Sequence, residues 1–206
     1  YMADVNASDQ ASTTTGGGGS RYQRVAFALT ILAWVIHVVS IVLRGIAAGH
    51  VPWSNMFEFA CLGTALMVGV FLAVQLWRDV RFLGAFVTGL VALLLGLASV
   101  NFYVPITPLP PALQSVWLVI HVFVATLATG FFAIGGGLSI VQLLQARRES
   151  GKPGLTVLRS MPSSEVLETI ANRLIIVGFA FWTFTLMAGA IWAGLYGLLD
   201  LFDDAE

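Results

Sequence analysis

The chain alternates between long apolar runs and short polar segments. Each run has the roughly 20 residues that an α-helix needs to cross a hydrocarbon core of about 30 Å, and each is too long for a β-strand. Within lipid, a helix satisfies its own backbone hydrogen bonds. The pattern therefore predicts an all-α integral membrane protein. Its five predicted transmembrane helices span residues 25–48, 56–77, 82–103, 115–145 and 170–199.

The first 20 residues contain no apolar run. They include Ser12-Thr13-Thr14-Thr15 and the glycine run Gly16–Gly19. Such a segment buries too little apolar surface to offset the entropy that is lost on ordering. We therefore predict a disordered cytoplasmic tail over residues 1–20 and a transmembrane domain over residues 21–206.

The basic residues predict the orientation. Of the ten Lys and Arg residues, only Arg44 lies toward one side of the predicted membrane. The positive-inside rule then places the N-terminus in the cytoplasm and the C-terminus outside. The uncharged loop 101–115 would face outward, and its prolines predict an extended lid. The basic residues of the inner side are Arg21, Arg24, Arg78, Arg81, Arg147, Arg148, Lys152, Arg159 and Arg173.

Composition narrows the class of protein. Hydrophobic residues make up 58% and charged residues 10% of the chain, whereas a soluble domain carries about a quarter charged residues. A water-soluble globular domain is therefore excluded. The net charge of −1 offers no basic surface for nucleic acid. The single cysteine, Cys61, excludes an internal disulfide and a cysteine-based zinc site.

Three histidines are candidates for chemistry, because an ionisable side chain within a membrane is costly. His37 is expected roughly 16 Å from the outer end of its helix, and His121 roughly 9 Å below the outer edge. His50 lies in the outer loop. A transmembrane histidine can also simply hydrogen-bond to a neighbouring helix, and His50 can be a solvated loop residue.

Several polar residues surround the start of the second predicted helix. Glu58 can complement the N-terminal dipole of this helix, and Ser54 and Asn55 are alternative caps. Arg44 can extend to the lipid headgroups or pair with Glu58 or with a ligand carboxylate.

Tryptophans and glycines lead to two further predictions. Trp53, Trp117 and Trp192 fall near the outer interface, where they can anchor the protein or form a wall for a flat apolar ligand. Gly130 and Gly135–Gly137 favour close packing of neighbouring helices, with a kink as the weaker alternative.

Three segments resemble the CcsA/ResC family, called CcsB in actinobacteria. These are system II cytochrome c biogenesis proteins of the wider haem-handling superfamily. Residues 49–59 are similar to its PxxN-(aromatic)-E pattern, and residues 112–122 to its LQSxWLxIHV segment. Residues 172–193 resemble the helix that leads to its haem-binding loop. The motif residues of the first segment are Pro52, Trp53, Asn55 and Glu58.

The resemblance implies haem transport and presentation at the outer membrane face, for covalent attachment to apocytochrome c. It implies haem b as the cofactor and places His121 at the position of an axial ligand to the haem iron, a role that suits neutral imidazole. Trp117 and Trp192 would lie beside the haem. His37 would lie on an intramembrane haem path, and its depth makes it a poor partner for His121 on one iron. His50 matches a variant of the first pattern with no assigned role.

The resemblance also implies partners and a location. The partners are a ResB/CcsB-like membrane subunit, apocytochrome c, a thiol-reducing thioredoxin-like protein and membrane lipid, in the bacterial plasma membrane. Family members continue into a WGxxWxWD loop, which this chain lacks after Ala193. We therefore expect the N-terminal three-fifths of a family member, and catalytic residues are not assigned.

Two other functions stay open at this point. The chain can be a non-catalytic membrane scaffold or cofactor-binding subunit, which the missing loop favours. It can also be a di-haem electron carrier of the cytochrome b type. That class needs four axial histidines, and the chain has three.

Overall fold

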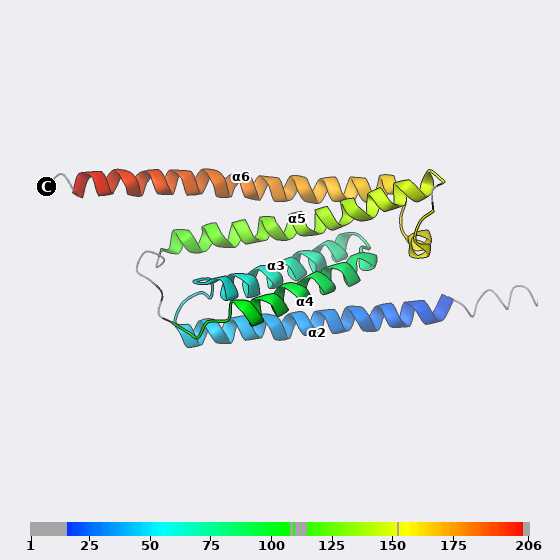
Figure 1. Ribbon diagram of the computed structural model, residues 1–206, viewed down its shortest axis with the longest axis horizontal. Coiled ribbons are helices and arrows are strands. Elements are labelled where there is room, and N and C mark those ends of the chain that lie inside the picture. The colour runs from blue at the N-terminus through cyan, green and yellow to red at the C-terminus, as the bar shows by residue number, and fades with distance from the viewer. Residues whose placement is uncertain (1–15, 108, 110–114, 152, 204–206) are drawn as a thin grey trace, which may run out of the picture.

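The computed structural model describes residues 16–107, 109, 115–151 and 153–203, and within them the fold is entirely helical (Figure 1). In the part of the chain that the structure describes, two short 3-10 helices lie in connections between the long helices, η1 (Arg81–Leu83) and η3 (Thr156–Ser160). The long helices are α2 (Gly16–Ala48), α3 (Met56–Trp77), α4 (Gly84–Asn101), α5 (Val116–Glu149) and α6 (Ser164–Asp203).

Each of the five long helices contains a stretch that is long and apolar enough to cross a membrane. The predicted all-α, five-helix, multi-pass membrane architecture is thereby confirmed. Helix α3 has the predicted bounds, whereas α2 begins at Gly16 rather than at residue 25, so residues 16–20 of the predicted tail are helical. Residues 1–15 of that tail lie outside the described residues. A formed helix can extend past its apolar run, because each added residue gains a hydrogen bond without a new nucleation step.

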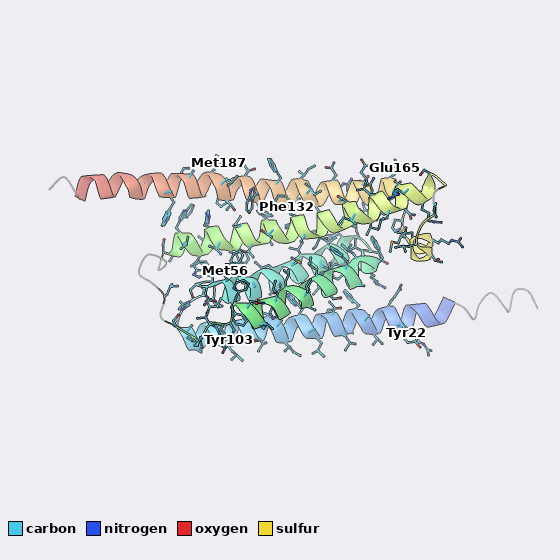
Figure 2. All side chains as sticks on the ribbon, in the orientation of Figure 1. Tyr22, Met56, Tyr103, Phe132, Glu165 and Met187 are labelled. Atoms are coloured by element: carbon cyan, nitrogen blue, oxygen red, sulfur yellow. The ribbon has the colours of Figure 1, made fainter. Side chains whose placement is uncertain are left out.

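Successive long helices run in opposite directions, so that chain ends and connections gather at two ends of the bundle (Figure 1). The arginine-rich end contains the start of α2, the α3–η1 connection, the end of α5 and the start of α6. The loop end contains residues 49–55 and 102–107. Figure 2 shows Tyr22 and Glu165 at the arginine-rich end and Met56 and Tyr103 at the loop end. Which end faces the cytoplasm stays a prediction.

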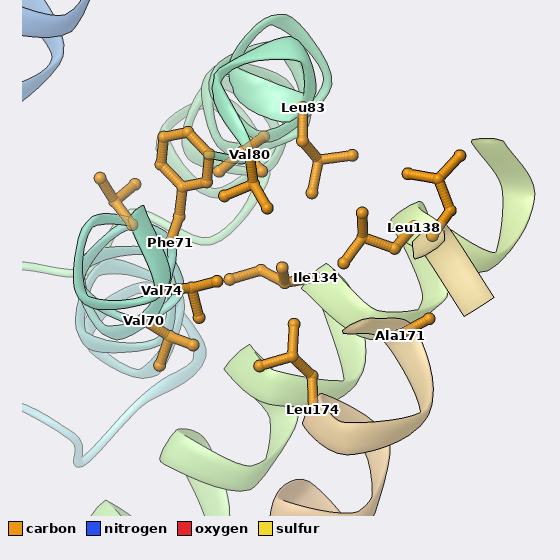
Figure 3. Packing of buried hydrophobic residues seen from close by; sticks show 12 residues of the cluster. Val70, Phe71, Val74, Val80, Leu83, Ile134, Leu138, Ala171 and Leu174 are labelled. Carbon is orange, nitrogen blue, oxygen red and sulfur yellow. The ribbon is translucent and has the colours of Figure 1, made fainter. Parts of the chain in front are cut away.

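Helix α3 occupies the centre of the bundle. It packs against α2, α4 and α5, and α6 packs against α5. A cluster of buried apolar side chains joins α3, α4, α5 and α6 toward the arginine-rich end (Figure 3). Its labelled members are Val70, Phe71, Val74, Val80, Leu83, Ile134, Leu138, Ala171 and Leu174.

Asp79 closes the turn between α3 and η1. The Gln75 Nε2 donates to Asp79 Oδ1 over 3.1 Å, and Gln75 Oε1 accepts from the Val80 N–H over 3.0 Å. The hydrogen bond from Gln75 lowers the pKa of Asp79, and the backbone N–H and the charge of Arg81 act in the same direction against the effect of burial. The carboxylate therefore stays charged and holds the turn.

Glycines in α5 allow the close packing that the sequence favours. A Cβ on Gly135 would lie 2.7 Å from Ile175 Cγ1 of α6, and a Cβ on Gly137 would lie 2.7 Å from Phe86 Cε1 of α4. A Cβ on Gly136 would meet nothing within 4 Å. Helix α5 is continuous through the three glycines, and Gly135 and Gly137 allow close contact with α6 and α4, respectively.

These contacts predict opposite effects for two adjacent substitutions. Gly135→Ala should destabilise the bundle by about 1–3 kcal/mol, because the added methyl overpacks the α5–α6 contact. Gly136→Ala should leave stability unchanged or raise it by up to about 1 kcal/mol, because alanine favours the helix. Thermal unfolding of the detergent-solubilised protein measures both effects. Equal melting temperatures for the two variants would contradict this account of the packing.

Candidate functional site

A pocket of about 250 Å³ lies between α5 and α6 near the loop end. Residues at spacings of three or four share one face of a helix. This spacing brings Trp117 and His121 together on α5, and Gly189, Trp192 and Ala193 together on α6. The residues that line the pocket are Trp117, Leu118, His121, Gly189, Trp192 and Ala193.

His121 has an unsatisfied nitrogen in this pocket. Its Nδ1 atom is buried and has no hydrogen-bond partner among the described residues. Leaving a buried polar atom unpaired costs about 1–3 kcal/mol, and such atoms in native proteins call for an explanation. An imidazole nitrogen is also a common ligand for haem iron. The unpaired atom therefore marks His121 as a candidate for ligand binding.

Gly189 makes room for the ring of His121. A Cβ at this position would lie 2.8 Å from His121 Cε1 and 3.6 Å from each ring nitrogen. The imidazole therefore lies directly against the backbone of α6. Gly189 is not among the site residues that the sequence predicts, although its spacing of three residues from Trp192 indicates that the two share one face of a helix.

His37 lies outside this pocket and is engaged with α3. Its Nε2 is 3.0 Å from the Cys61 carbonyl oxygen and 3.2 Å from Thr64 Oγ1. A carbonyl oxygen only accepts, so Nε2 carries the proton and donates. The contact fits the helix–helix alternative, and a haem-path role for His37 stays a prediction.

His50 also lies outside the pocket, and it joins two loop segments. Its Nδ1 is 2.9 Å from the Val51 carbonyl oxygen and its Nε2 is 3.3 Å from the Thr107 carbonyl oxygen. The second contact ties the connection before α3 to the segment after α4. The structure therefore does not bring His37, His50 and His121 together at one site.

Glu58 anchors the start of α3. Its side chain is only 1% exposed, and its Oε2 accepts from the backbone N–H and the hydroxyl of Ser54 over 2.9 and 2.8 Å. Asn55 Oδ1 accepts from the Glu58 N–H over 3.0 Å. Of the alternative caps, Asn55 is thus the N-cap, and Glu58 turns back toward the preceding segment as in a capping box.

Arg44 completes this group with an ion pair. Its Nε lies 2.9 Å from Glu58 Oε1, and its Nη2 donates to the Val104 carbonyl oxygen over 2.8 Å. The arginine is 15% exposed, so it pairs with Glu58 rather than extending to headgroups. The guanidinium also lies 5.1 Å from the centre of the Phe57 ring, which meets Tyr103 edge to face.

These contacts hold the described part of the predicted outer lid. Residues 102–107 are fastened to the ends of α2 and α3 through Val104 and Thr107. Residues 108 and 110–114 lie outside the described residues, so an extended lid stays a prediction. We call Arg44, Ser54, Asn55 and Glu58 the loop clamp.

Pro52 and Trp53 of the same motif are buried. Trp53 is 9% exposed, and its Nε1 has no hydrogen-bond partner among the described residues. Pro52 packs on Gly45, where a Cβ would lie 3.1 Å from the proline Cδ. Trp53 is therefore part of a packed corner in this chain rather than an exposed interface anchor.

The described residues contain no group of three or more His, Cys, Asp or Glu side chains that could hold a metal ion. His121 is the histidine in the lining of the pocket and can contribute one ligand to a metal ion.

The loop clamp predicts a large loss of stability when its charges are separated. Arg44→Gln should destabilise the protein by about 3–5 kcal/mol, because it leaves the Glu58 carboxylate buried without its partner. Amide hydrogen exchange over residues 102–107 should accelerate in the same variant. Thermal unfolding and exchange mass spectrometry measure these changes.

A matched control removes a second arginine from an exposed pair. Arg81 Nε lies 3.6 Å from Asp79 Oδ1, with both side chains well exposed. Such pairs contribute about 0–1 kcal/mol, so Arg81→Gln should change the melting temperature little. If Arg81→Gln destabilised the protein as much as Arg44→Gln, the clamp would carry no special role.

Comparison with known proteins matches the chain to a protein family. Residues 22–204 match the family described as "Cytochrome C assembly protein". A cytochrome c biogenesis protein CcsA of Prochlorococcus marinus is 29% identical over 187 residues, with 77% of this chain and 58% of the relative covered. CcsA of Trieres chinensis is 31% identical over 180 residues, with 73% and 58% covered.

A third relative carries a different name. Protein HemX of Brevibacillus brevis is 26% identical over 175 residues, with 84% of this chain and 63% of the relative covered. The chain thus spans about three-fifths of the length of these relatives. The family match covers nearly all of the chain and extends over all five long helices, beginning within α2. The chain therefore belongs to the cytochrome c assembly protein family and is similar to the N-terminal part of its CcsA members.

Proposed function

We propose that this protein presents haem b at the outer face of the bacterial plasma membrane for covalent attachment to apocytochrome c. The observation that carries the proposal is the buried, unpartnered Nδ1 of His121 in a tryptophan-lined pocket. Membership of the cytochrome c assembly family supports haem as the ligand class. In this proposal the loop end faces outward and the arginine-rich end faces the cytoplasm.

The pocket residues fit one part of a haem. The imidazole of His121 would be an axial ligand, and the indole rings of Trp117 and Trp192 would pack against the flat apolar macrocycle. Bound haem would supply vinyl groups that form thioether bonds with the cysteine thiols of the apocytochrome. The protein's own residues orient this group and keep water from the His121 side.

The volume of the pocket limits how much of a haem α5 and α6 would surround. Pockets that enclose a drug-sized ligand have volumes of about 300–1,000 Å³, and this one has about 250 Å³. The six lining residues would therefore contact one side of the haem and leave the other accessible. An accessible edge suits transfer to a second protein.

The proposed partners follow from the same chemistry. Apocytochrome c would supply the thiols, and a thiol-reducing thioredoxin-like protein would keep them reduced. A ResB/CcsB-like membrane subunit would complete the complex in the lipid bilayer. His37 would lie on a haem path within the membrane, and His50 would hold the loop at the outer face.

A haem spectrum of the detergent-purified chain tests the proposal. The wild-type protein, loaded with haem, should show a Soret band, and His121→Ala should lose it while the helical circular dichroism persists. Gly189→Ala should lower haem occupancy by about tenfold, because the added methyl displaces a ring that it leaves chemically intact.

The matched control is His50→Ala. It removes a histidine at the same end of the bundle but outside the pocket, so the Soret band should stay. A band that survives His121→Ala, or that His50→Ala also abolishes, would overturn the ligand assignment. The absence of any band in the wild type would favour the non-catalytic scaffold.

A further inference from the structure

A second and larger cavity lies far from the His121 pocket. It is a groove of about 740 Å³ at the arginine-rich end, between α3, α5 and the first half of α6. The groove uses none of the residues discussed above as haem contacts. It shares only buried Val74 and Leu174 with the apolar cluster in Figure 3.

The lining of this groove has charged and polar side chains toward one end and apolar side chains toward the other. The residues of α6 in the lining run from Glu165 to Phe181, which is a rise of about 24 Å along the helix. Arg78, Glu165, Thr169 and Arg173 lie toward the arginine-rich end of this stretch. Beyond them the lining is apolar. Its members there include Val177, Phe181 and Phe131, and the last two rings are stacked with centroids 5.8 Å apart.

The two arginines of the groove are available for an anion. Among the described residues, neither the Arg78 nor the Arg173 guanidinium has an ion-pair or hydrogen-bond partner. Glu165 is the one carboxylate in the lining, so the lining has a net charge of +1. Uncompensated arginines beside an apolar groove complement a ligand with an anionic head and an apolar tail.

We infer that this groove binds an anionic phospholipid. Its headgroup phosphate lies between Arg78 and Arg173, and an acyl chain extends along Val177 and Phe181. The length of the stretch agrees with this occupant, because one leaflet with its headgroups is about 20–22 Å thick. Basic pockets between transmembrane helices are typical sites for anionic headgroups.

The lining argues against haem as the occupant. The residues that line the groove include no histidine, cysteine, methionine or tyrosine, which are the side chains that ligate haem iron. A haem here would have two arginines for its carboxylates and no axial ligand. The lipid assignment is independent of the proposed haem function, which rests on the pocket at the other end.

Native mass spectrometry of the full chain, released from detergent micelles, tests the inference. With phosphatidylglycerol and phosphatidylcholine added at equal concentration, the wild type should retain the anionic lipid preferentially. Each arginine near a membrane surface contributes about 1 kcal/mol to the binding of anionic lipid. Arg78→Gln and Arg173→Gln should therefore weaken phosphatidylglycerol binding about fivefold each and about 30-fold together.

The control for charge is Arg159→Gln. It removes an exposed arginine at the same end but outside the groove, so binding should be unchanged.

A second pair of variants tests the apolar part of the groove without changing the charge of the protein. Val177→Trp fills the groove and should abolish lipid retention, whereas Ile176→Trp adds the same ring on an exposed position outside the groove and should not.

Three results would overturn the inference. The first is equal retention of the two lipids by the wild type. The second is an effect of Arg159→Gln as large as that of Arg78→Gln. The third is tight binding of haemin that the arginine double variant abolishes and His121→Ala does not, which would assign the groove to haem.

Discussion

The close approach of α5 to its neighbours is the interaction on which the rest of the structure depends. Lipid tails are as apolar as leucine, so burial of apolar surface does little to hold two transmembrane helices together. Close packing must do this instead. The missing Cβ atoms of Gly135 and Gly137 let Ile175 of α6 and Phe86 of α4 lie against α5, and Gly178 of α6 gives the same room to Phe131 and Phe132 of α5. The His121 pocket exists because the same pair of helices continues, still closely packed, to Gly189.

Hydrogen bonding separates His121 from three other ionisable side chains within the helices. Glu58, Arg44 and His37 each hydrogen-bond to a neighbouring segment. A buried polar network of this kind stabilises one arrangement only when its members are satisfied. His121 differs, because a ring nitrogen is buried without a partner in the part of the chain that the structure describes. Such a nitrogen is costly to the protein without a ligand and useful with one.

Some elements could be predicted from the sequence and others could not, for physical reasons. Apolar runs define where a helix crosses lipid, and at α3 the Asn55 cap coincides with the start of the run, so both bounds were correct. Helix α6 begins at Ser164 rather than at the predicted residue 170. Its first turns lie in a polar stretch, because helical hydrogen bonding outside lipid does not require apolar side chains. Trp117 and His121 share a face by spacing alone. Gly189 shares a face of α6 with Trp192 by the same spacing, but its contact with His121 joins two helices, which spacing within one helix does not specify.

The two cavities differ in a way that fits opposite tasks at opposite ends of one bundle. The groove at the arginine-rich end runs along α6 and offers charge without a metal ligand, which suits retention of a lipid. The pocket at the loop end is smaller and offers an imidazole with aromatic walls. A pocket below the size that encloses a flat ligand contacts it from one side. Under the proposed function this is the more useful geometry, since a fully enclosed haem could not meet the thiols of a second protein.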